Sequence, residues 1–466
     1  MTTIKLRYEN GLLQFEGELG YWINELSWFK LDPRTSIWSA PAESYRDTVL
    51  YLLKNRVSVI DEARKYKKLE LQLSESIIPR EHQHLALKAW QDQDSRGVVS
   101  LPTGAGKTIL AVLAIEAIKR PTLVVVPTID LLLQWLRILE KFFGGPVGQL
   151  GAGQRELHDL TVATYDSASI LADKIGDRFG LVVFDECHHL PAPQYQFIAK
   201  ALIAPFRLGL SATVERADGK ENILFELLGD MCYRGEIGQM VDQVLAPYDV
   251  INVQVPLSDH EKKAYQEART VYTQFIKRAG INFSEPQGWQ EFIRKSSILP
   301  GGREAMEAYR EQKRLAQGAE GKIFELWRIL QIHRGERIIV FTQDNATAYD
   351  IGRRFVLPVL THQTKPKERK LLLEAFRDGR IDVLVTSKVL NEGVDVPEAS
   401  VGIVISGSGA VREHVQRLGR ILRHQAGKRA KLYEVISKDT SEYYVNQRRR
   451  NHNAYQKPTE IQRSWR

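Results

Sequence analysis

Residues 185–189 place five side chains that can bind a metal ion next to one another. The stretch reads DECHH, so two carboxylates, one thiol and two imidazoles are adjacent. It follows the apolar run LVVF, which is typical of a short buried strand. Successive side chains of an extended chain point to opposite faces, and zinc sites space their ligands, so a contiguous Cys-His-His is a poor zinc site. We therefore interpret Cys187 as a small buried residue and the Asp185-Glu186 pair as suited to magnesium.

A second stretch supplies the phosphate loop that such a magnesium site needs. In VVSLPTGAGKTILAVLAIEAIK, a predicted buried strand at 97–101 runs into a glycine-containing loop and then into a helix with apolar periodicity. Gly104 and Gly106 allow the backbone to curl so that amide groups and the helix N-terminus point at phosphate oxygens. The first glycine of the usual phosphate-loop pattern is replaced by Leu101. A structural turn is the alternative, and the flanking strand and helix favour the phosphate loop.

The two stretches together predict ATP with Mg²⁺. Lys107 is expected to neutralise the β and γ phosphates, and Thr108 to ligate magnesium. Asp185 would hold the magnesium through water, and Glu186 would orient or deprotonate the attacking water. DECHH is therefore interpreted as part of a nucleotide site.

The segment HVQRLGRILRH predicts a helix with a polar stripe. Gln416, Arg420 and Arg423 lie on one face at helical spacing, and Leu418 and Ile421 lie on the opposite face. A pair of guanidinium groups on a packed helix can stabilise the charge of a transferring phosphoryl group. A solvated arginine face is the alternative for such a helix taken alone.

Strand-then-loop units recur through both halves of the chain. They predict two doubly wound parallel sheets, each with loops at the carboxyl ends of its strands, and a cleft between them that closes on ATP. The units are TLVVVPTIDLLLQW, LTVATYDSA, LVVFDECHH and FRLGLSATVERADG in the first half, and IIVFTQDN, DVLVTSKVLNEGVDVPEA and VGIVISGSG in the second.

Composition bounds the class of protein. With 466 residues, 43% apolar and 26% charged, the chain fits a globular enzyme of two to four domains. The N-terminus has no signal-peptide pattern and no run of ~18 apolar residues occurs, so we expect a cytoplasmic protein without membrane contact. Two cysteines are too few for a disulfide framework.

The net charge of +8 permits a polyanionic partner, and its distribution is uneven. Residues 1–75 carry eleven Lys or Arg and eleven Asp or Glu. From residue 447 onward, six Lys or Arg face a single acid, which is a net charge of +5. A solvated tail and a nucleic-acid contact are both consistent with this tail.

Two further segments have their own patterns. Residues 1–75 contain a hairpin signal about Asn10-Gly11 and an amphipathic helix that begins near Pro41. Their aromatic residues favour a small core over stacking on DNA; they are Trp22, Trp28, Phe29 and Trp38. Residues 257–318 interleave aromatic and cationic side chains, which suits either nucleic-acid contact or a helical hairpin packed on its own aromatics; they are Tyr265, Tyr272, Phe275, Phe283, Trp289, Phe292, Lys277, Arg278, Arg294 and Lys295.

The motifs, taken in order, resemble those of superfamily 2 helicases. They are PREHQ, LPTGAGKT, VVPTIDLLLQW, ATYDS, DECH, SAT, IIVFTQDN, TSKVLNEGVDVPEA and QRLGRILR, from about residue 77 to 425. The stretch from NEGVDVPEA to KLYEVIS is similar to archaeal and bacterial relatives of the xeroderma pigmentosum group B helicase. This resemblance implies an ATP-dependent 3′ to 5′ DNA helicase or translocase in DNA repair, with a damage-recognition-like N-terminal domain and a thumb insertion.

The resemblance also implies residue roles. Gln83 would bind adenine with support from Arg80, and Asp395 would lie near the nucleotide. Arg420 and Arg423 would be arginine fingers beside Gln416. The complete nucleotide-binding set is Arg80, Gln83, Thr103, Gly104, Ala105, Gly106, Lys107, Thr108 and Asp395. The residues that would couple hydrolysis to DNA are Pro127, Thr128, Ser211, Thr213, Arg216, Asp218, Thr386 and Ser387.

The expected organisation is a small α+β domain, two RecA-like domains and a mainly helical thumb. The boundaries are 1–75, 76–246 for the first RecA-like domain, 247–446 for the second with the thumb at 257–318, and a basic tail at 447–466. DNA, as a single strand or fork bound without sequence preference, is the expected partner of a monomer. The family implies an endonuclease as a further partner.

One departure leaves the mode of action open. The family's Arg-Glu-Asp element is Arg216-Ala217-Asp218 here and lacks its central carboxylate. A translocase that moves on duplex DNA with little unwinding is therefore an alternative to a helicase. The same motifs are also compatible with an RNA helicase, or with an ATP-switched DNA clamp or scaffold that needs a partner.

Overall fold

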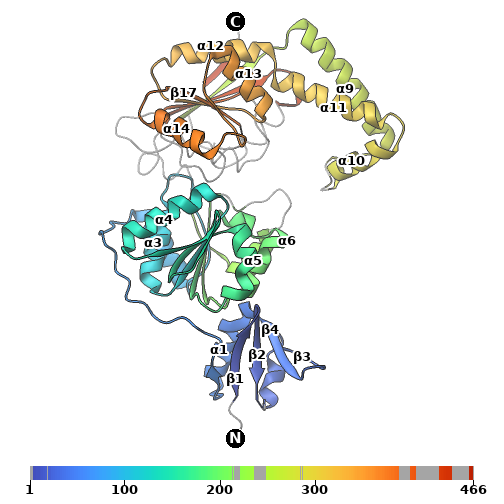
Figure 1. Cartoon of the computed structure of the whole chain (residues 1–466). Coiled ribbons are helices and arrows are strands. Elements are labelled where there is room, and N and C mark those ends of the chain that lie inside the picture. Colours follow the sequence, from blue (N-terminus) through green and yellow to red (C-terminus); the bar gives the residue numbers. More distant parts are fainter. Residues whose placement is uncertain are drawn as a thin grey trace. The chain divides into compact units, whose positions relative to one another are not determined.

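The computed structural model begins with a small sheet, of order β3-β4-β2-β1-β5, built on a hairpin (Figure 1). Asn10 and Gly11 have φ of +48° and +83°, the positive values that a tight turn between two strands requires. The hairpin predicted at these residues is therefore confirmed. The elements are β1 (Lys5–Glu9), β2 (Leu12–Glu16), β3 (Lys30–Asp32), β4 (Ile37–Pro41), α1 (Tyr45–Lys54) and β5 (Ile60–Asp61).

The described part of the chain divides into two units, residues 1–235 and 236–466. The structure describes residues 4–17, 19–212, 214, 221–235, 248–283, 285, 287–387, 399–405, 430–442 and 461–464.

Aromatic side chains form the core of the N-terminal sheet, as the sequence predicts. Phe29 is buried, and Trp22, Trp28 and Trp38 pack against the same cluster. The Trp28 indole donates a hydrogen bond of 3.0 Å to Thr48 Oγ1, which satisfies its polar group. These rings are therefore occupied in packing.

The N-terminal sheet is fixed to the rest of its unit through Tyr8. The Tyr8 hydroxyl lies 3.1, 3.0 and 2.9 Å from the carbonyl oxygens of Ala172, Asp173 and Ala201. A Cβ at Gly176 would lie 2.3 Å from that hydroxyl, so the close approach requires glycine. Burial raises the pKa of Tyr8, which keeps the hydroxyl protonated as a donor.

The remainder of the first unit is a doubly wound sheet of order β13-β6-β12-β11-β7-β10-β8-β9. Its strands are parallel except for the β8–β9 pair, and helices cover both faces, with α3 and α4 on one and α5 and α6 on the other (Figure 1). The strands are β6 (Arg96–Ser100), β7 (Thr122–Val126), β8 (Val147–Gly151), β9 (Gln154–Glu156), β10 (Leu160–Thr164), β11 (Leu181–Asp185), β12 (Phe206–Ser211) and β13 (Met231–Arg234). The helices are α2 (Glu81–Asp92), α3 (Lys107–Ile118), α4 (Ile129–Phe143), α5 (Tyr165–Ile175), α6 (Pro193–Ala201) and α7 (Glu221–Leu228).

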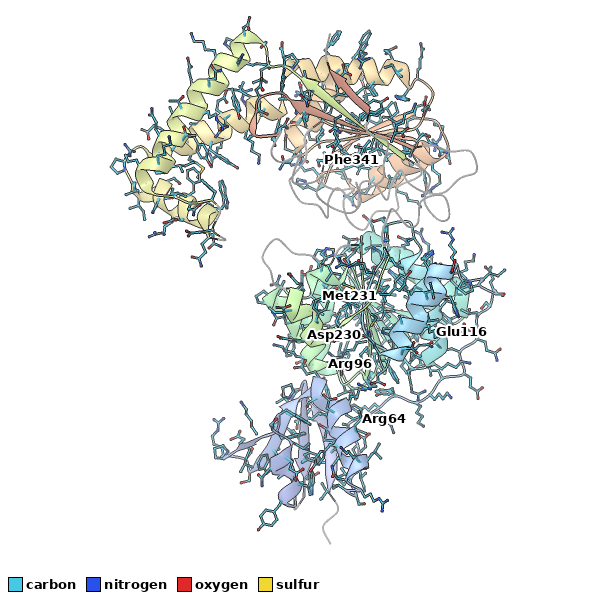
Figure 2. All side chains as sticks on the ribbon, turned by 180° about the vertical axis from the view of Figure 1, so that it is seen from behind. Arg64, Arg96, Glu116, Asp230, Met231 and Phe341 are labelled. Carbon is cyan, nitrogen blue, oxygen red and sulfur yellow. The ribbon has the colours of Figure 1, made fainter. Side chains whose placement is uncertain are left out.

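The second unit contains a parallel sheet of order β16-β17-β15-β18-β19-β14-β20. Phe341 of the central strand β15 is fully buried within it (Figure 2). The two doubly wound sheets predicted from the sequence are thus confirmed. The strands are β14 (Tyr248–Val255), β15 (Ile338–Phe341), β16 (Val359–Leu360), β17 (Val383–Thr386), β18 (Val401–Val404), β19 (Ala430–Ser437) and β20 (Ile461–Ser464), and the covering helices are α12 (Glu320–Ile332), α13 (Asn345–Phe355) and α14 (Pro366–Arg377).

Part of the predicted basic tail takes part in this sheet. Residues 461–464 form β20, which pairs in parallel with β14 from Ile251 to Gln254. This short segment is therefore paired in a sheet and is not a wholly solvated tail. The tail between 443 and 460 lies outside the described residues.

The predicted thumb consists of α9 (Asp259–Ala279), α10 (Gly288–Ile298) and α11 (Gly302–Gln317). Its aromatics pack on one another: the Tyr272 and Phe292 rings meet edge to face at 5.5 Å, and Tyr309 and Trp289 join them. Lys295 donates to the Ala279 carbonyl at 2.6 Å, which closes the end of α9. The alternative of a helical element packed on its own aromatics accounts for these contacts.

The first unit contains a buried cation that sequence pattern does not reveal. The Arg207 guanidinium is fully buried in β12 and donates to the carbonyls of Ala204, Leu227, Ala199 and Leu202 at 2.7 to 3.3 Å. It therefore joins the ends of α6 and α7 to the sheet by hydrogen bonds. Burial lowers its pKa, but the group stays charged at neutral pH because an arginine pKa starts so high.

We expect Arg207→Met to destabilise the protein by about 3–5 kcal/mol, because four buried carbonyl groups lose their donor. Chemical denaturation of the full chain measures this. Arg155→Met is the matched control, since Arg155 is exposed on β9, and it should change the unfolding free energy by less than about 0.5 kcal/mol. Equal effects of the two substitutions would contradict the assigned role of Arg207.

Candidate functional site

Five neighbouring parallel strands deliver the site residues to one edge of the first large sheet. The order β6-β12-β11-β7-β10 places the loops that follow these strands side by side at their carboxyl ends. Ligands of open parallel sheets bind at this edge. The stretches TGAGKT, DECH, PT and TYDS, together with Ser211 and Ala212, are distant in sequence and therefore share one edge.

The phosphate loop connects β6 to α3, which begins at Lys107. Gly104 and Gly106 both have φ of +87°, a conformation that favours glycine. Leu101, at the position of the missing first glycine, is fully buried, so the departure from the usual pattern is accommodated in the core. The amides at the N-terminus of α3 remain available for an anion.

Two side chains of helix α2 contact backbone carbonyl groups of the phosphate loop. Gln83 accepts a hydrogen bond from the Arg80 amide at 2.9 Å and donates to the Gly106 carbonyl at 3.1 Å. His82 Nε2 lies 2.7 Å from the Ala105 carbonyl oxygen, a contact that the sequence did not predict. Binding of adenine by Gln83 stays a prediction.

The two carboxylates of DECHH lie at the end of β11. Glu186 adopts a left-handed backbone, with φ of +48°, which is uncommon for a residue other than glycine. Its Oε1 lies 3.3 Å from Lys107 Nζ, and both side chains are nearly buried. The phosphate loop and the carboxylate pair, 79 positions apart, are therefore in direct contact.

A tryptophan of helix α4, which follows β7, holds the Asp185 carboxylate by a hydrogen bond. Trp135 of α4 is buried and donates from its indole to Asp185 Oδ2 at 2.9 Å, and the Glu186 amide donates to Oδ1 at 3.0 Å. Burial, followed by the charge of Glu186, raises the pKa of Asp185 to about 6, and Lys107 and the indole oppose that shift. The sequence did not single out Trp135, because an aromatic residue on the apolar face of a helix is typical of a packed core.

The thiol and the first imidazole of DECHH have other partners. Burial raises the pKa of the Cys187 thiol, which disfavours the thiolate that zinc requires. His188 Nδ1 lies 3.1 Å from Ser211 Oγ and 3.5 Å from Glu186 Oε2. The end of β12 is therefore linked to the carboxylate pair. No group of three or more His, Cys, Asp or Glu placed to hold a metal ion occurs among the described residues.

The donors at this edge fit a divalent cation beside a phosphate chain. Thr103 Oγ1, in the phosphate loop, is buried and has no hydrogen-bond partner in the part of the chain that the structure describes. Asp185 offers carboxylate oxygens at the end of β11, and Thr108 stands in the first turn of α3. Hydroxyl and carboxylate oxygens are the ligands that Mg²⁺ prefers.

Other predicted residues belong to other elements or lie outside the described residues. The Thr128 hydroxyl accepts from the Leu131 amide and caps α4, with Pro127 before it. Thr386 and Ser387 are buried at the end of β17 in the second unit. Their contact with DNA stays a prediction. Outside the described residues lie Thr213, Arg216, Ala217, Asp218, Asp395, Gln416, Arg420 and Arg423.

Three family models match the chain in succession. Residues 6–63 match the xeroderma pigmentosum group B helicase damage recognition domain. Residues 76–216 match the type III restriction enzyme res subunit, and residues 323–456 match the ERCC3/RAD25/XPB C-terminal helicase.

Individual relatives extend this similarity over the chain. The DNA 3′-5′ translocase XPB2 of Sulfurisphaera tokodaii is 37% identical over 447 residues, which cover 96% of this chain and 100% of that protein. The DNA 3′-5′ helicase XPB of Kineococcus radiotolerans is 32% identical over 74% of this chain and 58% of its own length. The Saccharomyces cerevisiae XPB/SSL2 subunit of general transcription and DNA repair factor IIH is 24% identical, over 82% and 44%.

Among solved structures, the Hef helicase domain of Pyrococcus furiosus has a similar fold. The TM-score is 0.55 at 21% identity, over 79% of this chain and 98% of the other. This likeness supports two helicase-type sheet domains.

We expect Trp135→Phe to shift the acid limb of ATP hydrolysis to higher pH. Asp185 must lose its proton to bind a cation, so activity falls as pH drops through its pKa. The substitution removes a hydrogen bond that lowers this pKa, so the pKa rises above about 6. The Mg²⁺ concentration for half-maximal hydrolysis should also rise several-fold. Rate profiles between pH 5 and 8 and magnesium titrations measure both effects.

Trp90→Phe is the matched control for this substitution. Trp90 is also fully buried, and its indole donates at 2.9 Å to the Arg207 carbonyl, away from the carboxylates. It should lower the unfolding free energy by about 1–3 kcal/mol and leave the acid limb in place. An acid limb that moves equally in both variants would rule out a specific role for Trp135.

Proposed function

The chain belongs to the xeroderma pigmentosum group B family of superfamily 2 helicases, and from this premise we propose that it is an ATP-driven 3′ to 5′ motor on DNA that acts in repair. Its relatives are named DNA 3′-5′ helicase or translocase. The phosphate loop and the carboxylate pair provide the hydrolytic centre. The substrate is ATP, and the polymer is DNA bound without sequence preference.

The observation that carries the proposal is the contact between Lys107 and Glu186 at 3.3 Å. A lysine for phosphate charge and a carboxylate for water are within reach of each other at one sheet edge. The link from Glu186 through His188 to Ser211 then provides a route by which γ-phosphate loss can alter the end of β12. Such a link is what coupling of hydrolysis to domain movement requires.

Each side chain of the centre has one task in this proposal. Lys107 and the phosphate loop of Thr103, Gly104, Ala105 and Gly106 hold the β and γ phosphates. Thr108 and Asp185 hold Mg²⁺, partly through water. When bound, Mg²⁺ neutralises phosphate charge in the transition state. Glu186 orients the attacking water and accepts its proton. Trp135 keeps Asp185 oriented toward the loop.

The remaining roles rest on the family motifs. Arg420 and Arg423, with Gln416, would contact the γ-phosphate from the second RecA-like domain, and Asp395 would lie near the nucleotide. Thr213 would act with Ser211 in coupling. Pro127 and Thr128, with Thr386 and Ser387, would move along the DNA backbone. Arg80 and Gln83 would serve adenine, and Arg216 and Asp218 strand separation.

We propose the same division of labour for the segments. Residues 1–75 sense the DNA structure, 76–246 and 247–446 form the motor with the thumb at 257–318, and 447–466 supply basic charge. A cytoplasmic monomer is proposed as well, with the endonuclease that the family implies as its partner. No described helix is long and apolar enough to cross a bilayer.

Translocation on duplex DNA with little strand separation is the second candidate function. Ala217 stands where the family has a carboxylate between Arg216 and Asp218. The Sulfurisphaera tokodaii relative, whose match covers 96% of this chain, is itself named a translocase. Both observations favour a motor that moves without efficient unwinding.

We expect Lys107→Ala and Glu186→Gln each to lower ATP turnover by at least about 100-fold, because one removes the phosphate cation and the other the carboxylate that orients water. Steady-state hydrolysis with and without DNA measures this, with circular dichroism to verify folding. Lys88→Ala, on the exposed side of α2, is the control and should retain full turnover. Normal turnover in Lys107→Ala would refute the assigned phosphate loop.

Stimulation by different polymers separates the candidate functions. A DNA motor is stimulated by single-stranded, forked or duplex DNA and not by RNA of equal length. Stronger stimulation by RNA would indicate an RNA helicase. Absence of hydrolysis under every condition, with DNA binding that still depends on ATP, would indicate a clamp.

We expect Ala217→Glu to increase strand separation on a forked substrate several-fold without raising the DNA-stimulated ATPase rate. The substitution restores the missing carboxylate, and the hydrolytic centre is unchanged. Ala217→Gln is the matched control because it adds the same bulk without the charge. Equal unwinding by all three proteins would show that this position does not limit strand separation.

A further inference from the structure

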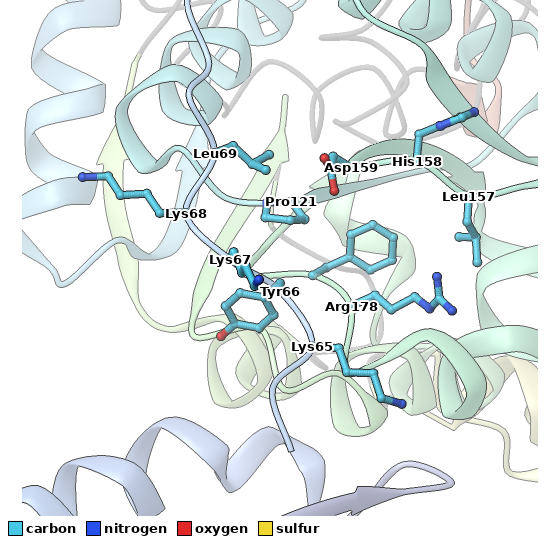
Figure 3. Close-up of a pocket in the computed structure, with 11 residues that line it drawn as sticks. Lys65, Tyr66, Lys67, Lys68, Leu69, Pro121, Leu157, His158, Asp159 and Arg178 are labelled. Atoms are coloured by element: carbon cyan, nitrogen blue, oxygen red, sulfur yellow. The ribbon is translucent and has the colours of Figure 1, made fainter. Parts of the chain in front are cut away.

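A pocket of about 720 Å³ lies at the edge of the first large sheet opposite to the edge of the phosphate loop. Figure 3 shows the residues that line this pocket. Its wall residues directly precede three parallel strands: Pro121 precedes β7, Leu157 to Asp159 precede β10, and Arg178 and Phe179 precede β11. The pocket therefore opens at the amino ends of the strands. Strands of five residues separate it from the nucleotide edge by roughly 17 Å.

The other wall is the segment that joins the N-terminal sheet to the motor. Residues 65–69 of this segment line the pocket. The Lys65 amide donates to the Asp177 carbonyl at 3.0 Å and the Leu69 amide to the Lys119 carbonyl at 2.9 Å. Between these two hydrogen bonds the Tyr66 ring is buried. The wall is thus held in place before any ligand arrives.

The charge of the pocket is positive. Lys65, Lys67, Lys68 and Arg178 line it, against Asp159 as the one acid among the lining residues. Lys65 is partly neutralised by Asp177 at 2.6 Å. Figure 3 shows the Lys68 side chain pointing away, so Lys67 and Arg178 are the cations best placed to meet a ligand, and both are exposed.

The neighbouring domain cannot supply this charge. Residues 1–63 hold seven Lys or Arg and nine Asp or Glu, a net charge of −2, whereas residues 64–68 hold four Lys or Arg and no acid. A domain of negative net charge is a poor binder of phosphates. The linker therefore carries the cationic charge adjacent to the domain that matches the damage recognition family.

We propose that this pocket binds the phosphate backbone of DNA beside the N-terminal domain, as a second contact apart from the motor's own. The proposal rests on the proposed function, since it takes DNA as the polymer. Lysine and arginine donors without base-reading groups suit phosphates of any sequence. Because the wall is held by backbone hydrogen bonds, binding costs little ordering of the chain.

The test uses the full chain, a 30-base-pair duplex and the pair Lys67→Gln/Arg178→Gln. The control pair is Lys30→Gln/Lys88→Gln, which removes the same charge from two exposed side chains, on β3 and α2, that do not line the pocket. The slope of log affinity against log salt is negative, and we expect it to become shallower by about two for the test pair, one for each lost phosphate contact. The salt slope of the control pair should change by less than half as much.

Acetylation of lysines, read by mass spectrometry, localises the contact. Duplex DNA should protect Lys67, and Lys30 and Lys88 should stay reactive. Equal salt slopes in both pairs, or an unprotected Lys67, would overturn the proposal. Protection by inorganic polyphosphate but not by duplex would also overturn it and identify a site for free phosphate chains.

ATP hydrolysis without DNA should be equal in both pairs, because neither touches the hydrolytic centre. This measurement separates the proposed motor from the proposed pocket. Failure of the proposed motor would appear as hydrolysis by the wild-type protein that DNA does not stimulate, whatever the acetylation pattern shows. Failure of the pocket would appear as an unchanged salt slope in a protein whose hydrolysis still responds to DNA.

Discussion

Burial of two adjacent carboxylates is the constraint on which the rest of the site depends. Asp185 and Glu186 are both less than a tenth exposed at the end of β11, and like charges so placed raise each other's energy. Lys107, the Trp135 indole and the Glu186 amide each offset part of that cost. The left-handed Glu186 backbone costs on the order of 1–3 kcal/mol more and turns the second carboxylate toward Lys107.

The side chains that contact the carboxylate pair, directly or through His188, follow or end three other strands, which explains why the sheet is needed. Lys107 follows β6, Trp135 belongs to the helix after β7, and Ser211, which contacts His188, ends β12. Parallel pairing brings these carboxyl ends together. A change at Lys107 or Trp135 reaches the carboxylate pair through one contact, and a change at Ser211 reaches it through His188. In the proposed function, these contacts would couple events at α4 and β12 to hydrolysis.

The sequence predicted what depends on local pattern. The glycine loop, the strand before Asp185, the Asn10-Gly11 hairpin and the aromatic N-terminal core each follow from neighbouring residues. Contacts over a long sequence separation had no such signal: no local pattern marks Trp135 or His82 as a contact of the site, and Arg207 stands in an apolar strand where no pattern predicts four carbonyl partners. Residues 461–464 read as a basic tail, because strand addition at an edge depends on β14 and not on their own pattern.

The two edges of the first sheet recognise anions by different means. At the carboxyl edge, the N-terminus of α3 presents amides and a positive dipole end. At the amino edge, helices end, so carbonyl groups face outward and an anion is repelled unless side chains reverse the field. Arg178, three residues after α5, also has the ordinary role of balancing a helix end. Lys67 belongs to the linker and not to a helix, and its place is set by the Lys65 and Leu69 amides, which donate to the carbonyls of Asp177 and Lys119.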